Sequence, residues 1–110
     1  MDSLIINQQL IEDISQKIVD HIKPEKVILF GSYASGKSTD SSDVDLIVVR
    51  NTSLPKTKRG IQIRRLFYRQ LIPIEIKVYT SDEFENESKT PFSFLFSAHK
   101  NNRVLYERQS

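Results

Sequence analysis

Two short groups of residues, Gly31-Ser32 and Asp43-Val44-Asp45, have the types and spacing that phosphate and metal chemistry requires. Residues two apart on a strand project to the same side, so we expect the carboxylates of Asp43 and Asp45 to lie close together. Two carboxylates held that close repel each other unless a proton or a cation lies between them. Ligation by oxygen alone favours Mg²⁺, with Mn²⁺ as an alternative, and waters and substrate phosphates usually complete the coordination.

A third carboxylate, Glu75, is expected to join this pair from a neighbouring strand. It lies in the alternating segment Ile74–Tyr79, out of phase with the apolar residues, and therefore faces away from the core that they contact. Gly31 permits close approach of the backbone to a ligand, and Ser32 offers a hydroxyl and an N–H. Such a set suits displacement at phosphorus, in which two metal ions roughly 4 Å apart hold the phosphates and stabilise the leaving oxygen.

Each of these groups has a plainer explanation when it is taken alone. Gly-Ser pairs are common in turns, and Asp-X-Asp at a strand edge is more often a turn or a surface feature than a metal site. A Glu on an alternating strand usually marks the solvent face of the sheet. The combination of the three groups, rather than any one of them, indicates a site.

Apolar periodicity predicts the elements that position these residues. Spacings of three and four predict a helix over 7–22, and a continuous apolar run predicts a buried strand over 27–30. Residues 31–42 form a predicted loop that can begin with a short helix. A second apolar run predicts a strand over 45–49, and strict alternation predicts another over 74–79.

Turn and capping signals predict the remaining elements. A basic amphipathic helix is predicted before Pro73, and its apolar side consists of Ile63, Leu66, Phe67 and Leu71. Thr80 and Glu83 have the spacing of a capping box for a short helix. Thr90-Pro91 predicts the start of a helix that runs to about Lys100, and residues 104–106 predict a final short strand.

Composition is that of a folded protein, with 38% hydrophobic and 27% charged residues. A chain of 110 residues is long enough for one compact domain, so we expect a single α/β or α+β domain over residues 1–110 with a small mixed sheet. There is no cysteine, so any metal must use oxygen or histidine ligands. The chain lacks a secretion signal and an apolar stretch of about 20 residues, and we therefore expect a cytoplasmic protein without membrane contact.

The strings Phe30–Gly36 and Ser42–Val49 closely resemble the signature of the DNA polymerase β-type nucleotidyltransferase superfamily, in its minimal, MNT-type branch. The resemblance extends to the leading helix, the Pro-Ile-Glu-Ile-Lys-Val strand and the closing Val-Leu-Tyr-Glu segment over 104–107. It implies the nucleotidyltransferase fold, and it implies a set of site residues. The catalytic and metal-binding residues would be Asp43, Asp45 and Glu75, and the nucleotide-binding residues would be Gly31, Ser32 and Lys37.

Members of this branch commonly resemble the antitoxin of a two-protein pair whose toxin is a HEPN-domain ribonuclease. The resemblance therefore implies transfer of AMP from ATP, with two Mg²⁺ ions, to a tyrosine hydroxyl of such a toxin within a hetero-oligomer. Two positions depart from the family. Ser35 stands where Arg is usual, so that one cationic contact near the phosphates would be either missing or replaced by Lys37, and Glu75 stands where Asp is more common.

These departures keep two other functions open. The first is a catalytically weak or inactive module of the same fold that neutralises the toxin by forming a complex with it. The second is a small-molecule nucleotidyltransferase, although enzymes of that type usually carry an additional domain.

Residues 50–69 contain seven cations and no acid, although the whole chain has a net charge of only +2. They are Arg50, Lys56, Lys58, Arg59, Arg64, Arg65 and Arg69. A basic surface of this kind can attract phosphates, nucleic acid or an acidic protein partner, or it can simply be a solvated helix face. Direct nucleic-acid binding is not expected, because no aromatic-rich recognition motif accompanies the charge. Docking of the toxin and steering of ATP are the functional interpretations that remain.

Overall fold

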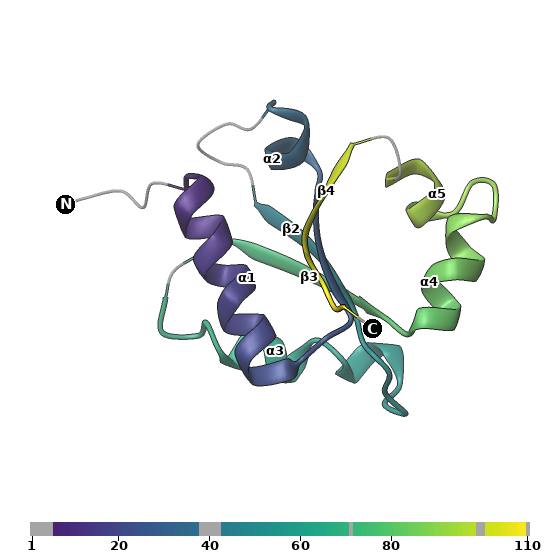
Figure 1. Ribbon diagram of the computed structural model, residues 1–110, viewed down its shortest axis with the longest axis horizontal. Helices are drawn as coiled ribbons and strands as arrows, with labels where there is room; N and C mark the ends of the chain where they lie inside the picture. The colour runs from purple at the N-terminus through teal and green to yellow at the C-terminus, as the bar shows by residue number, and fades with distance from the viewer. Residues whose placement is uncertain (1–5, 38–42, 71, 99–100, 110) are drawn as a thin grey trace.

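The protein has a four-stranded mixed sheet with helices on both faces (Figure 1). The computed structural model describes residues 6–37, 43–70, 72–98 and 101–109. The strands are β1 (Lys26–Phe30), β2 (Val44–Val49), β3 (Ile74–Tyr79) and β4 (Asn102–Glu107), in the spatial order β3-β2-β1-β4. β1 is antiparallel to both of its neighbours, whereas β2 and β3 are parallel. The predicted α+β class with a small mixed sheet is confirmed.

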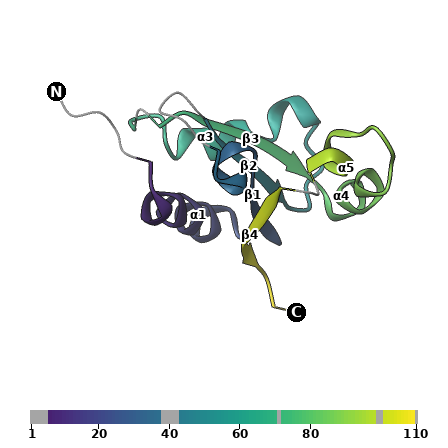
Figure 2. The same cartoon turned by 90° about the horizontal axis from the view of Figure 1, so that it is seen from above.

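Helix α1 (Gln8–Ile22) confirms the helix predicted over 7–22. The side chain of Asn7 caps its start by accepting a hydrogen bond from the N–H of Leu10 at 2.9 Å. Lys23, in the left-handed conformation, ends it by donating its N–H to the carbonyl of Val19. The helix and the α4–α5 pair lie at opposite sides of the strands in both views (Figures 1 and 2).

No helix within the described residues is long and apolar enough to span a membrane.

Each face of the sheet has its own apolar core. On one face, the even-numbered residues of β2 and β3, from Val44 to Val78, pack against the buried isoleucines of α1. On the other face, Ile47 and Val49 pack with Ile28, Phe30 and Leu95. β1 and β2 are buried on both faces, and for this reason their sequences are continuously apolar, whereas the edge strand β3 alternates.

The predicted basic helix is much shorter than expected. A 3₁₀ turn, η1 (Lys56–Lys58), precedes α3 (Ile61–Arg65), and tight turns follow. In these turns the N–H groups bond to carbonyls three residues back, as they do at Leu66, Phe67 and Gln70. The chain must return here to the start of β3, and this tertiary demand overrides the local periodicity. Ile63 and Phe67 are buried as predicted, whereas Leu71 lies outside the described residues.

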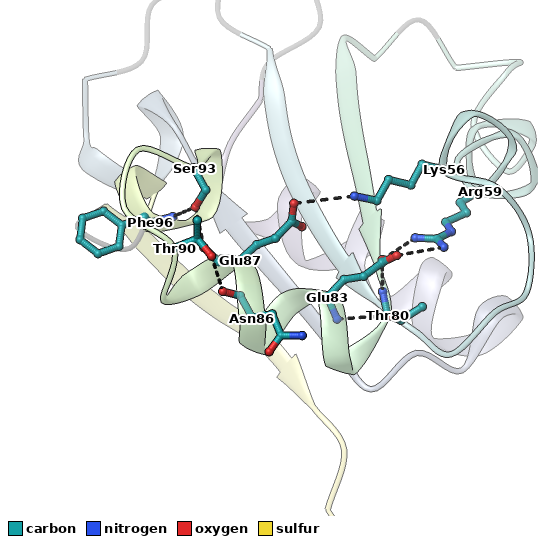
Figure 3. Close-up of polar contacts among 9 residues, drawn as sticks. All are labelled: Lys56, Arg59, Thr80, Glu83, Asn86, Glu87, Thr90, Ser93 and Phe96. Atoms are coloured by element: carbon teal, nitrogen blue, oxygen red, sulfur yellow. Dashed lines mark hydrogen bonds and ion pairs between the residues drawn. The ribbon is translucent and has the colours of Figure 1, made fainter.

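Helix α4 (Ser81–Ser88) begins with the predicted capping box. The Thr80 hydroxyl accepts from the N–H of Glu83, and the Glu83 carboxylate accepts from the N–H of Thr80 (Figure 3). Two residues three apart in the chain thus satisfy two otherwise unpaired donors at the start of the helix. A capping box can therefore be predicted from local sequence alone.

The helix predicted to start at Thr90 begins later and is shorter. Helix α5 spans Phe94–Ala98, and its start is capped by Ser93, whose hydroxyl accepts from the N–H of Phe96 (Figure 3). Thr90 instead donates its hydroxyl to the carbonyl of Asn86 at the end of α4. Phe92 has a φ of 69°, and this left-handed residue prevents a helix from continuing through it. The predicted end at Lys100 lies outside the described residues.

Arg59, one of the seven cations of residues 50–69, is a structural residue. Its side chain is only 9% exposed, and its Nη1 donates to Oε1 of Glu83 at 2.5 Å (Figure 3). Its Nε donates to the carbonyl of Leu54 at 2.8 Å. The hydrogen bond from Arg59, followed by that from the N–H of Thr80, lowers the pKa of Glu83 from its ordinary 4.5 to about 2. Arg59 therefore ties η1 to the start of α4.

Replacing Arg59 with Ala is expected to destabilise the protein by about 3 kcal/mol, since it leaves a charged partner unpaired; this is the low end of the usual range because Glu83 is 29% exposed. The pKa of Glu83 is lowered in the folded state, so the pair's contribution is present above about pH 4.5 and is lost as the pH falls towards 2. Urea unfolding of both proteins across this range measures the difference. A constant gap at all pH values, or an equal loss for the exposed control Arg65→Ala, would contradict the assignment.

Candidate active site

Gly31 follows β1 with a backbone conformation that is essentially reserved for glycine. Its φ is 78° and its ψ is −153°. A Cβ at this position would lie 2.4 Å from Oδ2 of Asp45. Because Phe30 pairs with Asp45 across β1 and β2, the backbone of Gly31 passes directly beside this carboxylate. The structure therefore requires glycine for its conformation and for the space that it leaves.

The short helix α2 (Ser32–Ser35) starts at Ser32, as the sequence allowed. The carbonyl of Gly31 accepts from the N–H groups of Ala34 and Ser35, both at 3.1 Å. The N–H groups of Ser32 and Tyr33 have no carbonyl one turn back, as at any helix start. The hydroxyl of Ser35 donates to the carbonyl of Ser32, so this side chain closes its own helix instead of supplying a cation.

Lys37 lies just beyond α2 and is exposed. Its N–H donates to the carbonyl of Ser32 at 2.9 Å. Among the described residues, no hydrogen bond or ion pair joins its side chain to the carboxylates. The structure therefore places the backbone of Gly31 against Asp45, with Ser32 next in the chain, whereas Lys37 is exposed beyond α2.

Asp45 and Glu75 lie side by side because they are register partners in the parallel pair of β2 and β3. As predicted, Glu75 lies on the face opposite to that of Ile76 and Val78. The pKa of Asp45 is raised from 3.8 to about 6, chiefly by burial and also by the hydrogen bond and negative charge of Glu75 and by the charge of Asp43. The sheet thus holds two carboxyl groups so close that they favour a shared proton or a cation.

The chemistry of this pair suits a hard divalent cation, which relieves like-charge repulsion between oxygen ligands. Within the part of the chain that the structure describes, no three Asp, Glu, His or Cys side chains are gathered into one metal-binding group. Asp43 lies exposed at the start of β2 and adds negative charge near the pair. Mg²⁺ usually takes few protein ligands and keeps waters and phosphates. The assignment of Asp43, Asp45 and Glu75 as metal ligands remains a prediction.

Lys77 is a charged residue of this site that sequence reasoning missed. Its Nζ lies 3.7 Å from Oε1 of Glu75 and 4.8 Å from the centroid of the Phe94 ring. Its positive charge lowers the pKa of Asp45, against the larger effects that raise it. The Phe94 ring in turn packs edge-on against Phe30, with centroids 5.0 Å apart. The alternation that places Glu75 also places Lys77, two residues later, on the same face.

In metal-free protein, Asp45→Asn is expected to increase stability at pH 7. The folded state raises the pKa of Asp45, so ionisation of this group destabilises the fold progressively as the pH rises from about 4 to about 6. Asn cannot ionise, so the stability difference between the variant and the parent is absent near pH 4 and complete above pH 6. Urea unfolding in EDTA measures it, with the exposed Asp20→Asn as a control. A variant that is no more stable than the parent at pH 7 would show that the two carboxylates do not repel.

The fold and this site together define a class of protein. A glycine-serine turn after one strand, with paired carboxylates on the next two strands of a mixed sheet, is the arrangement of a nucleotidyltransferase. The chain belongs to the polymerase β nucleotidyltransferase family, whose model, "Polymerase beta, Nucleotidyltransferase", matches residues 12–110. No curated protein matches the sequence significantly.

Several solved structures have a similar fold. A candidate nucleotidyltransferase from Sulfolobus solfataricus is 19% identical, with a TM-score of 0.64 over 91% of this chain and 79% of that one. A chain of a toxin–antitoxin structure with AMP-PNP is 20% identical, with a TM-score of 0.58 over 89% and 74%. A chain from the complex of a tri-AMPylated Shewanella oneidensis HEPN toxin with an MNT antitoxin is 20% identical, with a TM-score of 0.55 over 94% and 75%. At these identities the likeness shows the fold alone.

Proposed function

We propose that this protein is the antitoxin of a toxin–antitoxin pair and that it transfers AMP from ATP to a tyrosine hydroxyl of its cognate HEPN-domain toxin, with Mg²⁺ as cofactor. The observation that carries the proposal is the placement of Asp45 beside Glu75, with the backbone of Gly31 against Asp45. Family membership supports the class of reaction. Similarity to structures of a toxin–antitoxin with AMP-PNP and of an AMPylated HEPN toxin with its MNT antitoxin supports the nucleotide and the partner.

In the proposed reaction, the acceptor oxygen bonds to the α-phosphorus of ATP, the bond from that phosphorus to the bridging oxygen breaks, and pyrophosphate leaves. Gly31 and Ser32 bind the triphosphate on the β1 side of the site. Glu75, on the edge strand β3, faces the acceptor on the other side and accepts the hydroxyl proton. A divalent ion held by Asp43, Asp45 and Glu75 would neutralise phosphate charge and lower the pKa of the attacking hydroxyl.

Intact mass spectrometry tests this proposal. The protein is incubated with ATP, Mg²⁺ and the proposed HEPN-domain partner, and the partner is then weighed. We expect the partner to gain the mass of one or more adenylyl groups, and we expect EDTA to prevent the gain. A partner that is inhibited without any change of mass would refute the enzymatic function.

One set of observations favours a second function, neutralisation by binding alone. Glu75 is engaged by Lys77, and Ser35 closes its own helix instead of supplying a cation to the site. A module of this kind would inhibit the partner equally well with and without ATP. The same mass measurement, combined with an assay of the partner's ribonuclease activity, separates the two functions.

A further inference from the structure

The outer edge of β3 borders a basic hollow of about 340 Å³. Four consecutive residues of the strand, 76–79, form its floor, and residues of η1, α3 and α4 form its sides. Its charged lining residues are Lys56, Arg64, Lys77 and Glu87, so that three cations face one acid. β3 is at the end of the strand order, and within the described residues no strand pairs with this edge.

The backbone of β3 presents this edge as a template for another strand. The carbonyls of Pro73 and Tyr79 accept from the N–H groups of Val44 and Arg50, at 2.7 and 2.9 Å, and therefore point towards β2. Backbone groups of successive residues in a strand alternate in direction, so Ile76 and Val78 direct their N–H and carbonyl groups outward into the hollow. Unpaired groups of this kind are the usual site of strand addition by an extended peptide.

The side chains around the edge favour an acidic chain. The guanidinium group of Arg64 packs over Gly60, where a Cβ would lie 3.4 Å from it, so the absence of a side chain leaves room for this cation. Nζ of Lys56 lies 3.7 Å from Oε1 of Glu87, across the hollow (Figure 3). Oε2 of Glu87 is enclosed and has no hydrogen-bond partner among the described residues.

We propose that this edge of β3 binds an extended, acidic segment of the acceptor protein by strand addition, and thereby presents its hydroxyl to Glu75. This inference rests on the proposed function, and it adds the surface by which the acceptor docks. Glu75 and Lys77 belong to the same strand as the hollow, so a segment paired with Ile76 and Val78 reaches the carboxylates within one or two residues, at about 3.3 Å per residue. Lys56 and Lys77 lie beside Glu87 and Glu75, so the charge of Arg64 is the one that selects an acidic segment and steers its approach.

The cations have a simpler explanation, because charged residues at a sheet edge also protect against aggregation. The two explanations differ in what removal of a cation does. If the cations only protect the edge, reversing one of them changes self-association of the protein at most and leaves its affinity for the acceptor unaffected. If they form a docking surface, the affinity for the acceptor falls.

The test compares Arg64→Glu with Arg65→Glu, its exposed neighbour on the same helix, which does not line the hollow. We expect Arg64→Glu to raise the KM for the HEPN-domain partner about fivefold to tenfold, with a weaker dependence on salt. The KM for ATP and the rate at saturating partner are expected to change by less than about twofold, as are all constants of the control. Thermal unfolding checks that both variants fold.

Hydrogen exchange provides a second measurement that does not depend on transfer. On mixing with the partner in the absence of ATP, we expect the amides of Ile76 and Val78 to become protected in the parent protein and less so in Arg64→Glu. Protection confined to α5 or β4, equal effects of the two variants, or self-association without a change in partner affinity would each overturn the inference. If the parent protein binds the partner but never modifies it, the proposed transfer of AMP is refuted. The protection of the Ile76 and Val78 amides still tests the docking surface in that case.

Discussion

Replacing Asp45 with Asn is expected to reduce nucleotidyl transfer by on the order of 1000-fold while the protein remains folded. Asp45 lies between the Gly31 backbone and Glu75, so its carboxylate is the central oxygen ligand of the proposed site. Asn keeps the shape of the side chain but removes the negative charge that holds a divalent cation. Asp43→Asn is expected to cause a loss in the same direction.

The rate at which the partner gains adenylyl mass at saturating Mg²⁺ measures this loss. Asp20→Asn, on the exposed side of α1, serves as the matched control and is expected to leave the rate unchanged. An Asp45→Asn protein that retains transfer would remove this residue from the catalytic site. The unfolding measurements in EDTA show whether the variant is folded, and they therefore distinguish a loss of chemistry from a loss of folding.

Replacing Gly31 with Ala is expected to cause the second largest effect, a loss of about 100-fold in transfer and about 2 kcal/mol in stability. The new Cβ would lie 2.4 Å from Oδ2 of Asp45, and the backbone has a φ of 78° with a ψ of −153°, which side chains rarely tolerate. The chain can relieve the clash only by moving the carboxylate or the turn. Either movement disturbs the alignment of the nucleotide with Asp45.

Gly36→Ala is the matched control for this substitution. Gly36 also has a positive φ, 77°, but a Cβ at this position would have no atom within 4 Å. It is therefore expected to lose about 1 kcal/mol of stability and to keep nearly full transfer. If both variants lost transfer equally, the effect of Gly31→Ala would come from backbone strain in general and not from its approach to Asp45.

The basic segment over residues 50–69 shows how the structure divides what composition groups together. Arg59 is buried against Glu83 and holds two elements together. Arg64 and Lys56 face the hollow along β3, and Arg65 is exposed elsewhere on α3. Neither a uniform solvated face nor a uniform binding surface describes these cations, because they lie in at least three different environments.

Sequence alone determined those features whose causes lie within a few residues. The limits of α1, the alternation of β3 and the capping box of Thr80 and Glu83 depend on local periodicity and local hydrogen bonds, and all are confirmed. The glycine-serine and aspartate pairs were recognisable for the same reason, since their spacing along the chain reflects a turn between two neighbouring strands. The family that this spacing indicated is also confirmed.

The tertiary structure alone decided which distant residues meet. The strand order β3-β2-β1-β4 and the register of β2 with β3 bring Glu75 beside Asp45, and the return of the chain after α4 brings Phe94 over Lys77. It also shortened α3, because the chain turns back there towards β3, and it delayed the start of α5, because Phe92 is left-handed. Local pattern carries no information on such contacts, since they depend on how the sheet pairs and not on which residues are neighbours in sequence.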